Sequence, residues 1–189
     1  DRSVSRGLGD VYKRQVIYLG TFSKSIAPSL RISYMVLPLH LLKKYQESCS
    51  FYSTTVSKIQ QEVLREFIRG GYFGRHLNKM RGIYKNKHDF LVGELKKKNW
   101  VENIAGDNAG LHVLVQVNTT LTEEEICKKA TECGIRLMGI REHYIHTPPE
   151  GRPVLLLGYG KPDEQEIQKG LEVLESIITG RNSNNCKKP

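Results

Sequence analysis

Residues 18–38 read YLGTFSKSIAPSLRISYMVLP, and this stretch decides how the rest of the chain is interpreted. A largely apolar run, Val16 to Leu19, precedes a lysine, Lys24, and Arg31 comes seven residues after that lysine. A second apolar run, Ile32 to Val36, follows at once. The pattern predicts two strands of a buried sheet, joined by a connection that carries an amine, a guanidinium and several hydroxyl groups.

These residue types suit the covalent capture of an aldehyde cofactor. A lysine that forms a Schiff base must present an uncharged amine, and burial at a strand end with cations nearby favours that form. A phosphorylated aldehyde such as pyridoxal phosphate (PLP) also needs hydroxyl donors and a guanidinium whose planar fork binds two phosphate oxygens. The candidates are Thr21, Ser23 or Ser25, and Arg31. A Ser-Lys-Ser triplet taken alone is more often a solvated loop lysine after an ordinary strand, so the interpretation depends on the surrounding sequence.

Residues 18–38 resemble the cofactor-lysine segment of fold-type I PLP enzymes, and most closely the aminotransferase-like domain of MocR-type regulators in the GntR superfamily. Segment 70–92 resembles the long helix of this class I/II aminotransferase family, segment 109–113 a strand of its small domain, and segment 155–159 its closing strand. The resemblance implies an α/β fold. We expect the end of the large domain's sheet, a long interdomain helix and an α+β small domain.

The resemblance also implies roles for individual residues. Lys24 takes the position of the catalytic lysine that holds PLP as the internal aldimine, and Thr21, Ser23 and Arg31 take positions that bind the cofactor. Arg152 is the arginine nearest to the position at which such enzymes hold a substrate carboxylate, although a surface-loop role is the alternative. No spacing of ligand residues suggests a metal site.

Two serines depart from the family pattern. The family usually has glycine where Ser29 and Ser33 stand in this chain. Because glycine tolerates backbone angles that serine does not, these changes are expected to affect the loop around the cofactor phosphate.

The implied function is effector sensing in a transcriptional regulator. An amino acid or amine would displace Lys24 from the cofactor, and closure of the small domain around the adduct would reposition attached DNA-binding domains. The resemblance implies a homodimer, DNA binding through a separate N-terminal winged-helix domain, and weak or absent turnover. The alternative is a stand-alone class I/II aminotransferase acting on an amino acid and a 2-oxo acid.

The beginning of the chain has no counterpart in this pattern. Residues 1–15, DRSVSRGLGDVYKRQ, show no strand or helix period, and we interpret them as a non-native junction; a short native arm is the alternative. In the family the lysine lies past the middle of the domain, so a fragment is expected. The expected division is a large-domain portion with its interdomain helix at 16–95, a small domain at 96–181 and a disordered tail at 182–189.

Composition narrows the class of protein. The chain has 189 residues and 39% hydrophobic content, without a run approaching the ~20 apolar residues of a membrane span. No secretory signal is visible, and the four cysteines are scattered without metal-ligand spacing. We therefore expect a cytoplasmic protein without membrane contact.

The net charge of +9 is concentrated in one segment. Between Arg65 and Lys98 there are ten lysines or arginines against three acids. The same segment has apolar residues at the spacing of one helical face, so its basic residues are interpreted as the solvated side of a helix rather than as a nucleic-acid site. The apolar positions are Phe73, Leu77, Met80, Tyr84, Leu91 and Leu95.

The remaining elements follow from periodicity and caps. Thr122 with Glu125 forms a capping box that predicts a helix ending near Gly134. Pro162 is expected in the first turn of the last helix. The further predicted helices are Pro38–Tyr45, Ser53–Ile68, Tyr72–Lys98 and Pro162–Ile178, and the further predicted strands lie within 100–118, at 136–140 and at 154–158.

Overall fold

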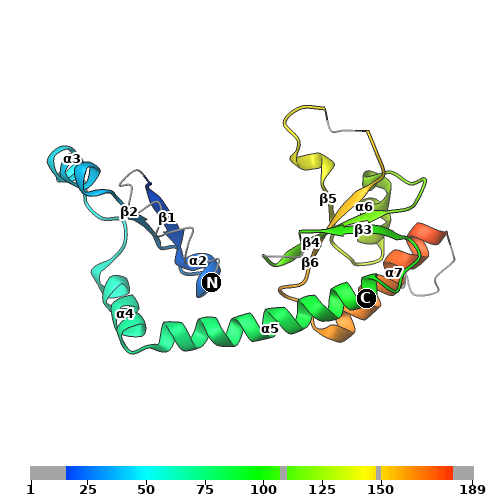
Figure 1. The fold of residues 1–189 in the computed structure, drawn as a ribbon, viewed down its shortest axis with the longest axis horizontal. Coiled ribbons are helices and arrows are strands. Elements are labelled where there is room, and N and C mark those ends of the chain that lie inside the picture. The colour runs from blue at the N-terminus through cyan, green and yellow to red at the C-terminus, as the bar shows by residue number, and fades with distance from the viewer. Residues whose placement is uncertain (1–15, 107–109, 148–149, 181–189) are drawn as a thin grey trace. The chain divides into compact units, whose positions relative to one another are not determined.

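The computed structural model describes residues 16–106, 110–147 and 150–180 (Figure 1). The predictions for residues 1–15 and 182–189 lie outside the described residues. The chain divides into two compact units, one ending at Met80 and the other beginning at Arg81. The domain boundary after residue 95 stays a prediction, and the two units are described separately below.

The first unit begins with an antiparallel pair of strands. β1 (Tyr18–Thr21) runs directly into the short helix α2 (Phe22–Ser25), and the chain returns as β2 (Ser33–Val36). The register pairs Tyr18 with Val36 and Thr21 with Ser33. Both strands are confirmed with slightly shifted ends, and Lys24 lies in the connection between them.

The predicted burial of these two strands is wrong for the described chain. Leu19 is 71% exposed and Val36 is 54% exposed, and Ile32 is the only residue of the β1–β2 segment that is fully buried in the part the structure describes. Apolar composition shows that these side chains favour burial, but a two-stranded ribbon has no second layer of its own to bury them.

Two helices follow the strand pair. α3 (Leu39–Cys49) is longer than predicted and starts one residue after Pro38, which caps it. The Leu42 side chain of α3 is exposed. α4 (Lys58–Arg69) starts later than predicted because Ser57 is its N-cap, with the Ser57 hydroxyl accepting a hydrogen bond of 3.2 Å from the Gln60 amide.

The long helix α5 (Tyr72–Leu95) confirms the predicted apolar stripe. Phe73, Leu77, Met80 and Tyr84 are partly buried, whereas Leu91 and Leu95 are fully buried. The regular helix ends at Leu95 rather than Lys98, because the Lys98 amide donates to the Leu95 carbonyl in a tighter turn. The exposed basic residues of this helix lie off the apolar stripe, as expected.

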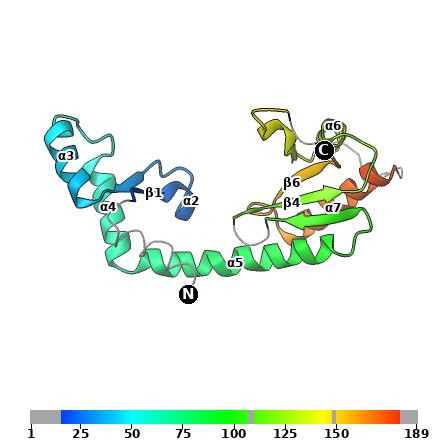
Figure 2. The ribbon, with the colours of Figure 1, turned by 45° about the horizontal axis from the view of Figure 1, so that its top comes forward.

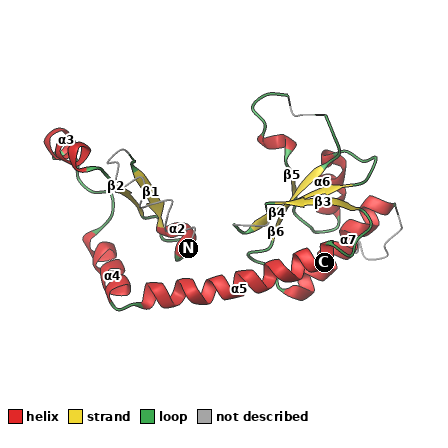
Figure 3. Cartoon of the chain, in the orientation of Figure 1, coloured by secondary structure: helices red, strands yellow, loops and turns green. Residues whose placement is uncertain are grey.

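The second unit contains a four-stranded antiparallel sheet (Figure 3). The strands β3 (Val101–Ala105), β4 (His112–Val117), β5 (Met138–Gly139) and β6 (Val154–Gly158) have the order β3-β4-β6-β5. β6 has the predicted bounds, and β5 is shorter than the predicted strand. β4 and β6 pair in continuous register from His112 opposite Gly158 to Gln116 opposite Val154.

Two further helices complete this unit. They are α6 (Glu123–Glu132) and α7 (Glu164–Thr179), and α7 lies beside the C-terminal part of α5 (Figures 1 and 2). An ion pair of 2.6 Å between Lys98 Nζ and Glu175 joins the end of α5 to α7. Alternate residues of β4 and β6 form one core with the three helices, and its fully buried members include Leu95, Val113, Val115, Val117, Ile126 and Leu155.

Capping residues set the helix ends of the second unit. The Thr122 hydroxyl accepts from the Glu125 amide, and the Glu125 carboxylate accepts from the Thr122 amide, which confirms the capping box. These hydrogen bonds lower the pKa of Glu125 below its ordinary value. Pro162 is not in the first turn of α7, because Asp163 caps that helix with Glu166 in a second capping box.

Among the described residues, no helix is long and apolar enough to cross a membrane.

Candidate functional site

The turn that carries Lys24 is held by backbone and hydroxyl hydrogen bonds. Thr21 caps α2, its hydroxyl oxygen accepting from the Ser23 amide at 3.2 Å. The Ser23 hydroxyl donates to the Leu30 carbonyl at 2.6 Å, and the Phe22 amide donates to the Ile32 carbonyl at 2.9 Å. The first and last residues of the connection are therefore tied to each other around Lys24.

The two predicted cations both lie on this connection with exposed side chains. Within the residues that the structure describes, neither Lys24 nor Arg31 makes a hydrogen bond or an ion pair. The buried surroundings expected for a Schiff-base lysine are not found around Lys24, because among the described residues no second layer covers β1, β2 and the connection between them. Thr21 ends β1, Ser23 and Lys24 lie in α2, and Arg31 precedes β2, so the four residues belong to one continuous segment between the two strands.

The hydroxyl groups around Lys24 already have partners. Thr21 donates to the Ile32 carbonyl at 3.3 Å, and Ser25 donates to the Thr21 carbonyl at 3.3 Å. With Ser23 donating to Leu30, all three hydroxyl protons are directed at backbone carbonyls. An anionic ligand would therefore meet the guanidinium of Arg31 and the amine of Lys24 first, and the hydroxyls only after rotation.

Ser33, at a position where the resemblance predicts glycine, fits the backbone of this structure. Ser33 is the first residue of β2 and pairs with Thr21. A strand conformation is accessible to every residue except proline without strain, so the backbone at Ser33 requires no glycine. Ser29 lies in the loop before Leu30, whose amide donates to the Ala27 carbonyl at 3.0 Å.

Aromatic rings surround the lysine turn, and the sequence analysis did not identify them. The Phe22 ring lies 5.1 Å from the Tyr34 ring and 5.9 Å from the Phe73 ring, measured between centroids. A hydrogen bond with Tyr18 raises the pKa of Tyr34 above its ordinary value. The available signal was the position of the aromatic residue Phe22 two residues before Lys24.

Arg152 lies two residues before β6, and its guanidinium has partners in the protein. Nε lies 3.2 Å from the Glu102 carboxylate, and one terminal nitrogen donates to the Asn118 side chain. The side chain is 46% exposed. This geometry favours the surface-loop alternative, and the substrate role of Arg152 stays a prediction.

A second feature that the sequence analysis missed is the buried carboxylate of Glu123, which is 4% exposed. It accepts hydrogen bonds of 2.9 Å from the backbone amides of Arg141 and Val154, the residues at the two ends of the β5–β6 connection. The residue of the sequence that reflects this packing is Gly139. A Cβ at position 139 would lie 2.3 Å from a Glu123 oxygen, so the carboxylate needs a glycine there. Glu123 therefore holds both ends of the connection to the start of α6.

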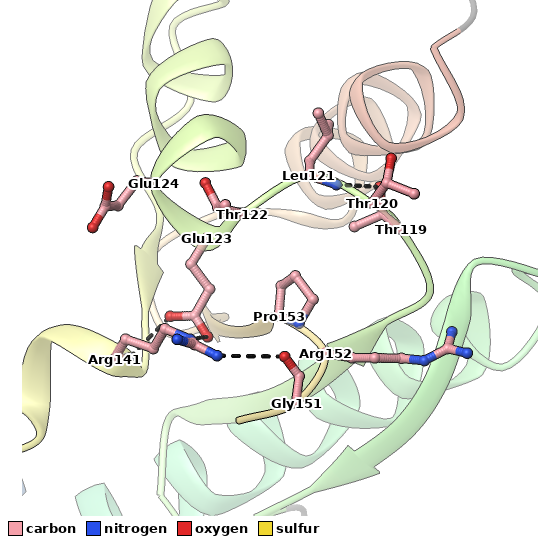
Figure 4. A pocket seen from close by; sticks show the side chains of 10 residues that line it. All are labelled: Thr119, Thr120, Leu121, Thr122, Glu123, Glu124, Arg141, Gly151, Arg152 and Pro153. Atoms are coloured by element: carbon pink, nitrogen blue, oxygen red, sulfur yellow. Dashed lines mark hydrogen bonds and ion pairs between the residues drawn. The ribbon is translucent and has the colours of Figure 1, made fainter. Parts of the chain in front are cut away.

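A pocket of about 500 Å³ lies beside this carboxylate (Figure 4). Its lining includes Thr119, Thr122 and Arg141, and most of the polar groups already have partners. Thr119 donates to the Ile178 carbonyl, Thr122 caps α6, and Arg141 donates to the Gly151 carbonyl at 3.4 Å. The pocket therefore offers few free groups to a ligand, and the lysine turn remains the chemically stronger site.

No group of three potential metal ligands from His, Cys, Asp and Glu occurs among the described residues.

Solved aminotransferases share this fold. LysN, the α-aminoadipate aminotransferase of Thermus thermophilus, complexed with N-(5'-phosphopyridoxyl)-L-leucine, matches with a TM-score of 0.73 and 23% identity over 94% of this chain and 44% of its own. The multiple substrate aminotransferase of Thermococcus profundus matches with a TM-score of 0.72 and 23% identity over 87% of this chain and 41% of its own. The chain therefore has the α/β fold of fold-type I aminotransferases.

The family follows from the sequence profile. The profile of "Aminotransferase class I and II" matches residues 4–168, which include the lysine turn, α5 and the sheet of the second unit. The chain belongs to this family.

The similar curated proteins include transcriptional regulators. The uncharacterized HTH-type regulator YdeL of Bacillus subtilis is 39% identical over 86% of this chain and 35% of its own length. The probable rhizopine catabolism regulatory protein MocR of Rhizobium meliloti is 29% identical over 87% of this chain and 33% of its own. The chain thus spans about a third of the length of the curated regulators it matches.

Proposed function

We propose that this chain is the PLP-binding, aminotransferase-like part of a MocR-type transcriptional regulator, and that it senses an amino acid or amine effector. The observation that carries the proposal is Lys24, an amine without a partner among the described residues, held on a tied turn beside Arg31. The family membership and the similarity to regulators such as YdeL support it.

The residues present fit the cofactor chemically. PLP, when bound, supplies an aldehyde that condenses with primary amines and a ring that withdraws electrons from the adduct. Lys24 Nζ would hold the aldehyde carbon, and the planar guanidinium of Arg31 would bind phosphate oxygens in pairs. Thr21 and Ser23 would contribute hydroxyl donors after turning from the carbonyls to which they now donate.

Lys24 also has a role once an effector amine takes its place. The released Nζ is a basic atom on the same turn, and it is available to accept a proton from the effector. In a regulator the useful result is a change in domain arrangement, so catalytic turnover is expected to be weak. DNA would be bound by a separate N-terminal winged-helix domain of the parent protein.

The first test is selective trapping of PLP. The protein is mixed with limiting PLP, reduced with borohydride and digested, and modification of Lys24 is compared with that of Lys79, an exposed lysine of α5. We expect Lys24 to be modified several-fold more than Lys79, and Arg31→Gln to raise the PLP concentration required by about tenfold, the cost of a charged hydrogen bond. Equal modification of the two lysines would contradict the proposal.

The alternative is a stand-alone aminotransferase. Relatives of this kind are the aromatic-amino-acid aminotransferase 1 of Thermococcus litoralis, 22% identical, and the 2-aminoadipate transaminase of Thermus thermophilus, 24% identical. Sequencing the native gene across the codons for residues 1–30 separates the two. An upstream winged-helix domain supports the regulator, and an upstream aminotransferase arm alone supports the enzyme.

The substrate role of Arg152 is part of the same proposal. An effector carboxylate at Arg152 would have to compete with Glu102, which lies 3.2 Å from its guanidinium. If Arg152 binds the effector, Arg152→Lys weakens effector binding and leaves PLP trapping at Lys24 unchanged. Titration calorimetry of the PLP-loaded parent protein with candidate amino acids tests this, and unchanged effector affinity assigns Arg152 to the surface loop.

We also propose a cytoplasmic homodimer. Fold-type I proteins usually complete their sites across a dimer, which supports this proposal. Light scattering of the PLP-loaded parent protein measures the mass, and a monomer at micromolar concentration would contradict the dimer.

A further inference from the structure

The helix that carries Lys24 is too short to be stable through its own hydrogen bonds. α2 consists of the four residues Phe22–Ser25, a single turn, and forming one turn fixes several backbone angles for very few hydrogen bonds. The hydroxyl contacts of Thr21 and Ser23 tie the backbone of this turn to the rest of the loop. They and the Phe22 amide join it to the residues just before β2 but not to α3, α4 or α5, so a contact with one of these helices would further constrain the direction in which Lys24 projects.

Phe22 supplies such a contact. Its partly buried ring lies between two others, with centroid distances of 5.1 Å to Tyr34 on β2 and 5.9 Å to Phe73 on α5. The Phe22–Phe73 pair meets edge to face at 73°, a preferred geometry for aromatic rings. Phe73 in turn lies 6.4 Å from Phe67 of α4. The turn is therefore joined through one ring to a strand and two helices of the first unit.

Gly20 leaves the space that this arrangement needs. Gly20 pairs with Tyr34 across the two strands, and a Cβ at Gly20 would lie 2.3 Å from Cζ of the Tyr34 ring. The ring of Tyr34 therefore lies directly over the backbone of β1. From there it reaches Phe22, and its other neighbour is Tyr18 at 6.0 Å.

We propose that Phe22 is a positioning residue for Lys24. By packing between Tyr34 and Phe73, it sets the orientation of α2 and so the direction of the Lys24 amine. The expected effect on PLP capture rests on the function proposed above. The expected ordering of the turn by Phe22 does not.

The experiment compares three variants of the chain. Phe22→Leu keeps apolar volume but removes the ring contacts, Phe22→Tyr restores a ring, and Phe51→Leu removes an exposed aromatic residue outside the turn as a matched control. Two readouts are taken from each: hydrogen exchange of the α2 amides relative to those of α4, and borohydride trapping of PLP at Lys24 relative to Lys79.

Phe22→Leu is expected to lower amide protection in α2 about tenfold, as loss of two ring contacts implies, while α4 stays protected. Trapping at Lys24 should fall several-fold, and Phe22→Tyr and Phe51→Leu should keep both readouts at the original level. Unchanged α2 protection in Phe22→Leu would overturn the positioning role.

A second variant covers the case in which Phe22→Leu unfolds the first unit. Tyr34→Leu removes one ring contact from the opposite strand and is expected to give the same selective loss at α2. Loss of protection throughout α4 in both variants would also overturn the proposal, because the role would then be general stability. If the unchanged chain traps no PLP at Lys24, the proposed function fails, while the exchange comparison still decides the role of Phe22.

Discussion

The two strand regions of this protein contain similar apolar side chains in different surroundings. In the second unit Val113, Val115 and Leu155 are fully buried under helices. In the first unit Leu19 and Val36 are mostly exposed. The contrast shows that a short apolar strand is buried, and contributes to stability, only where another layer covers it.

The largest expected difference between the regions comes from truncating a leucine. Leu155→Ala should lower the free energy of unfolding by about 2–5 kcal/mol, because it leaves a cavity in a closed core. Leu19→Ala should change it by less than about 0.5 kcal/mol, since that side chain is already in solvent. Urea unfolding followed by circular dichroism measures both, and similar losses would remove the distinction drawn between the two strand regions.

The next prediction concerns the buried carboxylate of the second unit. Glu123→Ala should cost about 1–3 kcal/mol, because the partly buried amides of Arg141 and Val154 lose their acceptor. Its neighbour Glu124 is exposed, so Glu124→Ala is the matched control and should have little effect. Thermal unfolding of the two variants tests this, and equal shifts would show that the two amides do not depend on Glu123.

A glycine pair tests the packing of the first unit. Gly20→Ala should destabilise this unit by about 1–3 kcal/mol, because the new methyl group meets the Tyr34 ring. Gly74→Ala meets nothing within 4 Å and lies in a helix, so it should stabilise by up to about 1 kcal/mol. Hydrogen exchange of the α2 and α5 amides measures whether each variant is less or more stable than the original chain. Unchanged exchange in Gly20→Ala would show that Tyr34 moves aside freely.

The smallest effect is expected from pH. Hydrogen bonds with Thr122 hold the pKa of Glu125 below its ordinary value. The ionised carboxylate therefore stabilises the second unit at pH values above the ordinary pKa of a glutamate. The contribution is lost as the pH falls through the lowered pKa. As the pH falls below about 4.3, the free energy of unfolding should therefore decrease, and it should decrease less steeply in Glu125→Gln. Unfolding curves measured at a series of pH values test this. An identical slope in the variant would rule out Glu125 as its source.

Much of the local structure could be predicted because its causes lie close together in the sequence. The capping box spans Thr122 to Glu125, and the apolar stripe of α5 repeats every three or four residues. The same holds for the candidate site, since Thr21, Ser23, Lys24 and Arg31 lie within eleven consecutive residues.

Errors arose where two local signals competed or where the end of an element was set by a neighbour. Pro162 suggested the first turn of α7, but the stronger cap at Asp163 places the helix start after it. Ser57 likewise sets the start of α4, which composition alone placed too early.

By itself, the sequence determined the family, the position of Lys24 and Arg31 on one connection, and the helices whose caps and periods lie within a few residues. Only the tertiary structure decided that Phe22 packs between Tyr34 and Phe73, that Glu123 joins both ends of the β5–β6 connection, and that Arg152 pairs with Glu102. The physical reason is distance along the chain. Caps and helical faces are set by neighbouring residues, whereas ring contacts, buried carboxylates and ion pairs depend on segments that only folding brings together.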